Sequence, residues 1–411
     1  MKLEPGTFAA LRYRNFRLLW TGQMVSITGT MMQSAAILWH VSLLVPPQRK
    51  GLALGMVGLV RIVPIVSLSI LGGVMADAKD RRRLMLVTQS AMAVLSGILA
   101  FLTLSGHASL LTVYLLAGMT AMAGAFDGPA RQSLAPNLVP REHIPNAISL
   151  NTIVFQGASV IGPSMAGIVI ASLGIGWAYA LNAASFLAVL VALAAMRDLP
   201  KQERTGRDAI SFRAALEGIR FVFRAPLIRG SMLLDFFATF FSSATFLLPI
   251  FAQDILKVGA RGYGWLYAAP SIGALLAGAA MIGAIERIHR RGRVLFLAVF
   301  GYGLATVLFG ISRSFWITFV CLALTGATDI VSTVIRNVIR QLTTPDALRG
   351  RMTSVSMVFF MGGPQLGEME AGIVAQLLGA PFSVISGGLG CLAATAWLAA
   401  KSPELRRYRR S

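Results

Sequence analysis

Residues 73–83 read Gly-Val-Met-Ala-Asp-Ala-Lys-Asp-Arg-Arg-Arg, and residues 283–293 read Gly-Ala-Ile-Glu-Arg-Ile-His-Arg-Arg-Gly-Arg. Each of these basic segments separates two long apolar runs, and the two segments lie close to half a chain length apart. Two shorter patterns are repeated at a similar separation: Gly-Ala-x-Asp at 124–127 and 326–329, and an arginine followed nine residues later by a proline at 131–140 and 336–345. The sequence therefore predicts a duplicated unit, which is characteristic of secondary transporters.

The composition excludes a soluble domain. Apolar residues make up 55% of the 411 residues, charged residues only 13%, and the mean hydropathy is +0.69. A soluble domain carries roughly 25% charged residues, so this chain could not cover a surface that faces water. Cys321 and Cys391 both lie in apolar runs, where they are expected to be small core residues without a disulfide.

The apolar runs have the length of membrane spans, since a bilayer core takes about 20 apolar residues per helix. Glycine and proline mark several of the joints between them. The sequence predicts an all-α integral membrane protein with twelve transmembrane helices, at 18–44, 52–76, 84–105, 108–129, 145–172, 174–196, 228–251, 262–285, 293–312, 314–337, 352–378 and 380–400.

One long polar stretch, from Arg197 to Arg229, divides the spans into two sets of six. Apolar and basic residues alternate over 212–224 with helical spacing, which predicts an amphipathic helix on the membrane surface. We therefore expect three parts: an N-terminal six-helix bundle at 1–196, a cytoplasmic linker at 197–227, and a C-terminal six-helix bundle at 228–411.

The distribution of positive charge predicts the orientation. The net charge of +20 would suit a nucleic-acid binder, but the basic residues form short clusters between apolar runs, so we expect the lipid bilayer as partner and no nucleic acid. Lysine and arginine concentrate on the cytoplasmic side of membrane proteins. With both termini cytoplasmic, the outer loops hold only a few basic residues: Arg49, Lys50, Lys257, Arg261 and Arg313.

Several motifs resemble the major facilitator superfamily over nearly the whole chain. Gly73-x-x-x-Asp77-x-x-x-Arg81-Arg82 is similar to the superfamily's loop signature, and Gly162-Pro163 with Gly167 is similar to the kinked-helix motif of its antiporters. The chain looks most like the enterobactin-exporter branch, the transmembrane secretion effectors, in these segments: 15–20, 22–30, 129–132 and 350–352. Two residues depart from these motifs: Ala166 stands where the kinked-helix motif usually has a second glycine, and Glu286 stands in place of the aspartate in the loop of the second half.

The resemblance implies two pseudo-symmetric six-helix bundles and a conformational latch formed by Gly73, Asp77, Arg81 and Asp127. Asp77 should lie near the N-terminal end of span eleven, where the helix dipole favours a carboxylate. Arg81 should pair with Asp127 and hold the outward-facing state. The alternative is that the arginines of this loop only set the orientation.

Charged residues inside spans are candidates for coupling or gating, because a charge at the bilayer centre costs about 2.5–3.5 kcal/mol on insertion scales. Arg61 is expected to pair with Glu368 or Glu370, unless it snorkels outward. Asp235 is a candidate proton carrier or a structural acid. Asp329 is expected to pair with Arg336, seven residues on along the same helix face.

Neutral polar and aromatic residues inside spans could line a substrate cavity, although each could equally pack between helices: Gln33, Phe155, Gln156, Phe240 and Phe359. The sequence has no metal-ligand cluster and no phosphate-binding glycine loop, so we expect no cofactor and no ATP-driven transport. A membrane enzyme would need a clustered nucleophile or acid–base pair, which the sequence does not offer.

The sequence thus predicts a monomeric secondary transporter in the plasma (inner) membrane. Its partners are expected to be a small-molecule substrate and protons. The export direction follows from the resemblance alone, and proton coupling from the acids inside the spans, which show no sodium-site pattern. Together they imply a proton-coupled efflux antiporter for a small amphipathic molecule, a drug or a siderophore, working by alternating access. An importer or uniporter of the same fold for a small metabolite is the alternative.

Overall fold

The structure is a computed structural model that describes residues 8–78, 80–197, 220, 225–241, 245–285, 287–344 and 349–409. Within these ranges, the side chains at 69–70, 72–74, 76–78 and 349–362 are outside the description. The expected amphipathic helix at 212–224 lies almost wholly outside the described residues, so it stays a prediction.

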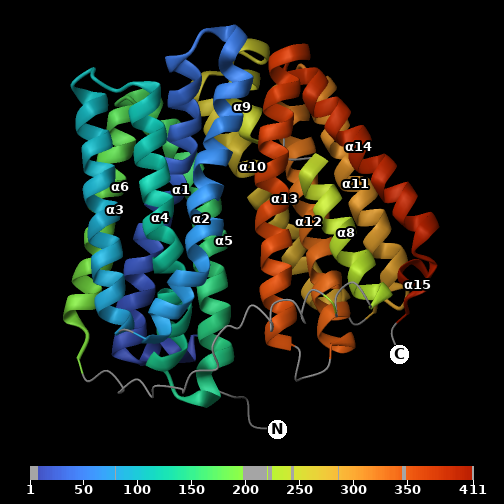
Figure 1. Cartoon of the computed structure of the whole chain (residues 1–411), viewed down its shortest axis with the longest axis horizontal. Helices are drawn as coiled ribbons and strands as arrows, with labels where there is room; N and C mark the ends of the chain where they lie inside the picture. Colours follow the sequence, from blue (N-terminus) through green and yellow to red (C-terminus); the bar gives the residue numbers. More distant parts are fainter. Residues whose placement is uncertain are drawn as a thin grey trace. The chain divides into compact units, whose positions relative to one another are not determined.

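Long α-helices make up nearly all of the described chain (Figure 1). The helices of the first half are α1 (Arg14–Leu44), α2 (Lys50–Ala78), α3 (Arg81–Leu104), α4 (Leu110–Leu134), α5 (Ile144–Ser172) and α6 (Ile175–Ala195). Those of the second half are α8 (Pro226–Phe241), α9 (Leu248–Ile250), α10 (Gly259–Ala284), α11 (Arg291–Ile311), α12 (Phe315–Thr343), α13 (Arg349–Leu378), α14 (Ala380–Lys401) and α15 (Pro403–Arg407).

The chain divides into two compact units. One comprises Met1–Leu44 and Val60–Arg207, and the other comprises Val45–Leu59 and Asp208–Ser411. The start of α2 thus belongs to the second unit, although the sequence assigned all of α2 to the first bundle. The expected bundle boundaries at 196 and 228 remain predictions.

The same helix pairs recur in both units. In the first, α1 packs against α5 and α6, and α3 packs against α4 and α6. In the second, α8 packs against α13 and α14, and α11 packs against α12 and α14. These are the equivalent pairs if each unit is a copy of one six-helix motif, so the packing agrees with the duplication that the repeated segments predict.

Local sequence explains where several helices begin. The Asp80 side chain accepts hydrogen bonds from the backbone nitrogens of Arg82 and Arg83, at 2.9 and 3.1 Å, and so caps α3. Gly174 and Gly379 precede α6 and α14 with φ of 97° and 90°. Other residues rarely adopt this backbone conformation, so glycine allows the tight turn at the same joint of each half.

Small residues let the helices approach closely. A Cβ atom added at Gly273 of α10 would lie 1.7 Å from the carbonyl oxygen of Ala323, and one at Gly326 of α12 would lie 1.8 Å from that of Pro270. Close backbone contact of this kind is typical of helix packing in membranes, where small residues favour van der Waals contact. The crossing of α10 and α12 therefore depends on these two glycines.

The prediction of an all-α fold with twelve long helices is confirmed for the described residues. Ten helical segments have the length and apolar composition of a membrane span, among the described residues. The 31-residue α1 falls outside that set, and it carries polar residues such as Gln23, Ser26 and Gln33 among its apolar ones. In α13, the side chains at 349–362 lie outside the description.

The seventh span differs from the regular helix expected at 228–251. The structure describes α8 as far as Phe241 and then, from Thr245, a 3-10 turn, the short α9 and a π-helix at Phe251–Ile255. Pro249 lies in this stretch and has no backbone N–H to donate, which weakens regular helical bonding. π-Helical segments frequently occur at functional sites.

Candidate functional site

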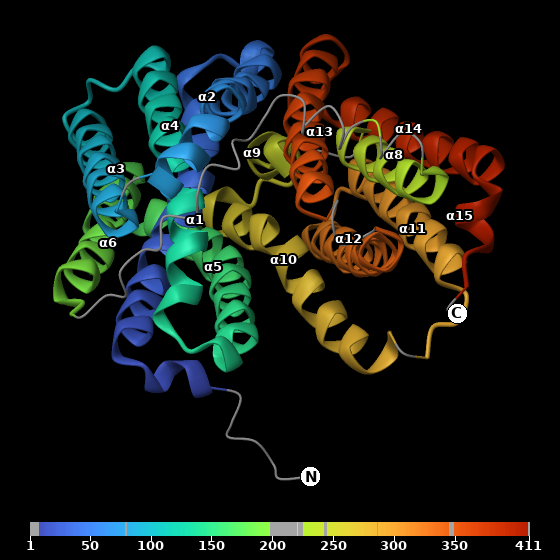
Figure 2. The ribbon, with the colours of Figure 1, turned by 60° about the horizontal axis from the view of Figure 1, so that its bottom comes forward.

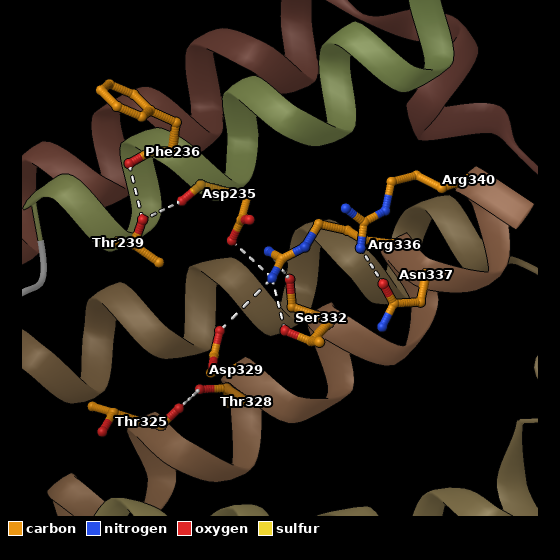
Figure 3. Close-up of polar contacts among 11 residues, drawn as sticks. Asp235, Phe236, Thr239, Thr325, Thr328, Asp329, Ser332, Arg336, Asn337 and Arg340 are labelled. Carbon is orange, nitrogen blue, oxygen red and sulfur yellow. Dashed lines mark hydrogen bonds and ion pairs between the residues drawn. The ribbon is translucent and has the colours of Figure 1, made fainter. Parts of the chain in front are cut away.

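An arginine and two aspartates meet inside the second unit (Figure 3). The Arg336 Nη2 atom lies 2.8 Å from Asp235 Oδ1 and 3.9 Å from Asp329 Oδ1. The side chain of Arg336 is 5% exposed and that of Asp235 is 13% exposed, whereas that of Asp329 is 48% exposed. One guanidinium thus lies between a buried carboxylate and a more accessible one.

Two helices supply this cluster. Asp329 and Arg336 are seven residues apart on α12 and share one face, so the contact expected from their spacing is present. Asp235 comes from α8, across the helix interface. Hydroxyl groups of α12 complete the surroundings, because Arg336 Nη1 donates to Ser332 Oγ at 2.7 Å and Nη2 donates to Thr333 Oγ1 at 2.8 Å.

The neighbouring turns of both helices are also held by polar contacts (Figure 3). Thr239 Oγ1 donates to the carbonyl oxygen of Asp235 at 2.8 Å, and Arg340 donates to the Asn337 side chain one turn beyond Arg336. A buried guanidinium must keep an anionic partner, because removing one member of a buried pair leaves an uncompensated charge. If one carboxylate of the cluster is neutralised, another carboxylate must therefore balance the charge of the arginine.

Part of the expected latch lies in the first unit. Asp127 is buried in α4 and accepts hydrogen bonds from Thr88 Oγ1 and Gln89 Nε2 of α3, each at 3.0 Å. Arg81, the first residue of α3, donates to the carbonyl oxygen of Ser133 at 3.3 Å. Gly73 and Asp77 lie on α2, but their side chains are outside the described part. The latch therefore stays a prediction.

The expected gate residues lie on α2 and α13. Glu368 packs against α2 within the second unit, because a Cβ atom at Gly58 would lie 2.4 Å from its Oε2. Glu370 is partly buried on the same helix, α13. Arg61 lies on the part of α2 that belongs to the first unit, and its pairing with either glutamate stays a prediction.

The antiporter-like motif lies in the middle of α5. Gly162, Pro163 and Gly167 are buried, and Pro163 is inside the helix. A Cβ atom at Gly162 would lie 2.7 Å from the carbonyl oxygen of Thr28 in α1. The motif therefore makes a close contact between α5 and α1.

The cavity candidates fall in different surroundings. Gln33 is buried, and its side-chain oxygen accepts a hydrogen bond from Asn182 Nδ2 of α6 at 2.8 Å. Phe155 and Gln156 lie on α5, and half of the Phe155 surface is exposed. Phe240 stacks on Phe236 of α8 with ring centroids 5.8 Å apart. Phe359 lies outside the described side chains, so a shared cavity stays a prediction.

An ion pair that sequence reasoning missed joins the start of α2 to the π-helix. Lys50 Nζ lies 2.9 Å from Asp254 Oδ2 and 2.8 Å from Gln253 Oε1, and the Lys50 side chain is 8% exposed. The charge count treated Lys50 as an outer-loop residue. No local pattern could have revealed this contact, because its partners lie more than two hundred residues further along the chain.

The described residues hold no group of three or more histidine, cysteine or acidic side chains that could bind a metal ion. A buried, charged cluster between helices of an apolar bundle is instead a feature of membrane transporters, in which intramembrane charges mark ion and substrate pathways. The repeated helix packing and this cluster are together typical of a secondary transporter.

The chain belongs to the transmembrane secretion effector family of the major facilitator superfamily, because the family model matches residues 5–408. It is 28% identical over 397 residues to the protein named enterobactin exporter EntS from Shigella boydii and to that from Escherichia coli O1:K1. These matches cover 96% of this chain and 94% of each relative.

Solved transporters share the fold. The nucleoside transporter NupG superimposes with a TM-score of 0.75 at 11% identity, over 94% of this chain and 98% of NupG. A bacterial homologue of the iron transporter ferroportin, in an inward-facing state, gives 0.71 at 16% identity, over 96% of this chain and 99% of that one. These likenesses confirm the expected superfamily fold. The family match, the exporters among the relatives and the apolar helices indicate a multi-pass inner-membrane transporter.

Proposed function

We propose that this chain exports a small amphipathic molecule, of the siderophore or drug type, in exchange for protons. The family membership and the exporters among its relatives support the export direction. The observation that carries the proposal of proton coupling is the buried contact of Arg336 with Asp235, which has the more exposed Asp329 as a second partner.

The cluster offers a way to couple proton binding to a change of partner. When Asp235 binds a proton, it loses its negative charge, and the guanidinium 2.8 Å away loses its nearest counter-charge. Asp329, 3.9 Å away on the same helix as Arg336, can then compensate the arginine. Release of the proton restores the first pairing. The contact between α8 and α12 would therefore differ between the two protonation states.

The remaining site residues belong to the same proposal. Alternating access by rocking of the two bundles would use the latch of Asp77, Arg81 and Asp127, together with a gate between Arg61 and Glu368 or Glu370. Both termini would be cytoplasmic and the working form a monomer.

Proteoliposomes that contain the purified chain and an internal pH indicator test the proposal. Enterobactin serves as one probe, because the named relatives export it, and a lipophilic dye serves as another. Addition of a transported probe to one side should drive protons in the opposite direction. Asp235→Asn should abolish this proton movement, whereas Asp235→Glu should keep it.

Glu404→Gln is the matched control, since Glu404 is an exposed acid of the same unit. It should behave as the wild type. Probe transport that persists without proton movement, and is unaffected by Asp235→Asn, would rule out the exchange. Movement of probe and protons in the same direction would instead identify an importer.

A further inference from the structure

Arg291, the first residue of α11, is buried, and its side chain has no partner among the described residues. Only 8% of its surface is exposed, and its Nε atom is enclosed without a hydrogen-bond acceptor. Among the residues that the structure describes, its guanidinium makes no hydrogen bond or ion pair. This contrasts with Arg336, the other buried arginine of the described residues, which has two carboxylates and two hydroxyls around it.

Such an arginine needs an acceptor. A guanidinium stays protonated in proteins and presents five N–H donors in a fixed plane. A buried charge without a partner is strongly unfavourable. The described residues supply no acceptor for this Nε–H, and a phosphate group fits a guanidinium well because it can accept two parallel hydrogen bonds.

The chain end packs beside Arg291. The short helix α15 and the residues after it lie beside the start of α11 (Figure 2), and the backbone nitrogen of Gly292 donates to the carbonyl oxygen of Tyr408 at 3.1 Å. A Cβ atom at Gly292 would lie 1.8 Å from the carbonyl oxygen of Leu405. The chain end therefore packs closely against the first turn of α11.

Exposed positive charges surround this place. They come from both segments and lie within a few residues of Arg291 or Leu405 along the chain: Arg290, Arg293, Arg406 and Arg407. The acid of α15 is Glu404, which is exposed and makes no ion pair with Arg291. The local charge therefore favours an anion, and the position at the end of a membrane span places it at the level of lipid headgroups.

We infer that Arg291 binds a phosphate-type anion at the start of α11, with the surrounding arginines favouring a net-negative source such as an anionic phospholipid headgroup. Free phosphate has the same chemistry and is the other possible source. This site is separate from the Arg336 cluster, so it does not depend on the proposed proton exchange.

The full-length chain in maltoside micelles, which contain no phosphate, tests the inference. The thermal unfolding midpoint is measured alone and with equal concentrations of phosphatidylglycerol, phosphatidylcholine or inorganic phosphate. A ligand that binds only the folded state raises the midpoint. Phosphatidylglycerol should raise it most, and Arg291→Gln should remove that rise. A rise with inorganic phosphate as large as that with phosphatidylglycerol would identify free phosphate as the source.

Arg293→Gln is the matched control, because it removes one exposed positive charge two residues away. It should keep most of the rise. An equal rise in wild type and Arg291→Gln would overturn the inference, as would a wild-type chain that responds to none of the three additions. If Arg291→Gln does not fold, Arg291→Lys replaces it. Since lysine lacks the planar fork, its rise should be smaller than that of the wild type, and an equal rise would count against the site.

Discussion

The Arg336 side chain contacts two carboxylates and two hydroxyl groups, and the free energy of these contacts can be tested directly. Removal of one partner from a buried ion pair costs about 3–5 kcal/mol, because the other charge is left uncompensated. Arg336→Gln should therefore lower the free energy of unfolding by about this amount. The measurement is the unfolding midpoint of the purified chain in detergent.

The double variant Arg336→Gln with Asp235→Asn should recover most of the loss, since it removes both charges. Coupling between neighbours appears as non-additivity of the two changes. If the losses of the two single variants simply add, the 2.8 Å contact is not an energetically coupled pair.

Residue-level prediction from the sequence worked where spacing along one helix decides the outcome. Asp329 and Arg336 meet as their seven-residue separation predicts. The Asp235 contact could not be predicted, because it depends on how α8 is rotated against α12. The same limit applies to Lys50 and Asp254, which come from different halves of the sequence. Gln33 was a cavity candidate, yet its bond to Asn182 ties α1 to α6.

At the scale of elements, the crossing of α10 and α12 gives a prediction with a control inside one helix. Gly273→Ala places a methyl group 1.7 Å from the Ala323 carbonyl oxygen, so the two helices must separate. Overpacking of this kind typically costs about 1–3 kcal/mol. We expect a lower unfolding midpoint and a lower yield of folded protein in detergent.

Gly278→Ala is the control on the same helix, because its Cβ would lie 3.7 Å from Ile330 Cγ1, an ordinary contact. It should be neutral or slightly stabilising, since alanine favours helix by about 1 kcal/mol over glycine. Equal effects of the two substitutions would show that close packing at Gly273 does not hold this crossing.

Helix positions were largely predictable, because long apolar runs and turn glycines decide them. The predicted span at 293–312 and α11, for example, agree to within two residues at each end. The conformation of the stretch from Thr245 to Ile255 was not predictable, because hydropathy does not distinguish an α-helix from 3-10 and π segments. The same π segment carries Asp254, whose contact with Lys50 was missed for the separate reason that the two residues are far apart along the chain.

At the scale of the whole molecule, the orientation in the membrane can be tested by labelling single cysteines introduced into the native sequence. Cys321 and Cys391 are both buried, so the wild type should react little with a membrane-impermeant maleimide. Ser105→Cys lies in the exposed joint between α3 and α4, and Glu142→Cys lies in the exposed joint between α4 and α5. In intact cells, Ser105→Cys should be labelled and Glu142→Cys should be labelled only after lysis.

This pattern follows from the concentration of basic residues in alternate joints. Labelling of Glu142→Cys in intact cells, with Ser105→Cys protected, would reverse the orientation. Labelling of both sites in intact cells would contradict the assignment of α4 as a membrane span.

The two repeated Gly-Ala-x-Asp segments have diverged, so the partners of the aspartate in one half can be compared with those in the other half. In the first copy, Asp127 is held by the uncharged donors Thr88 and Gln89. In the second, Asp329 shares a guanidinium with Asp235. If the two halves descend from one ancestral sequence, this position was free to acquire different chemistry in each. Exchanging the surroundings of these two aspartates would show which of those changes made the halves unequal.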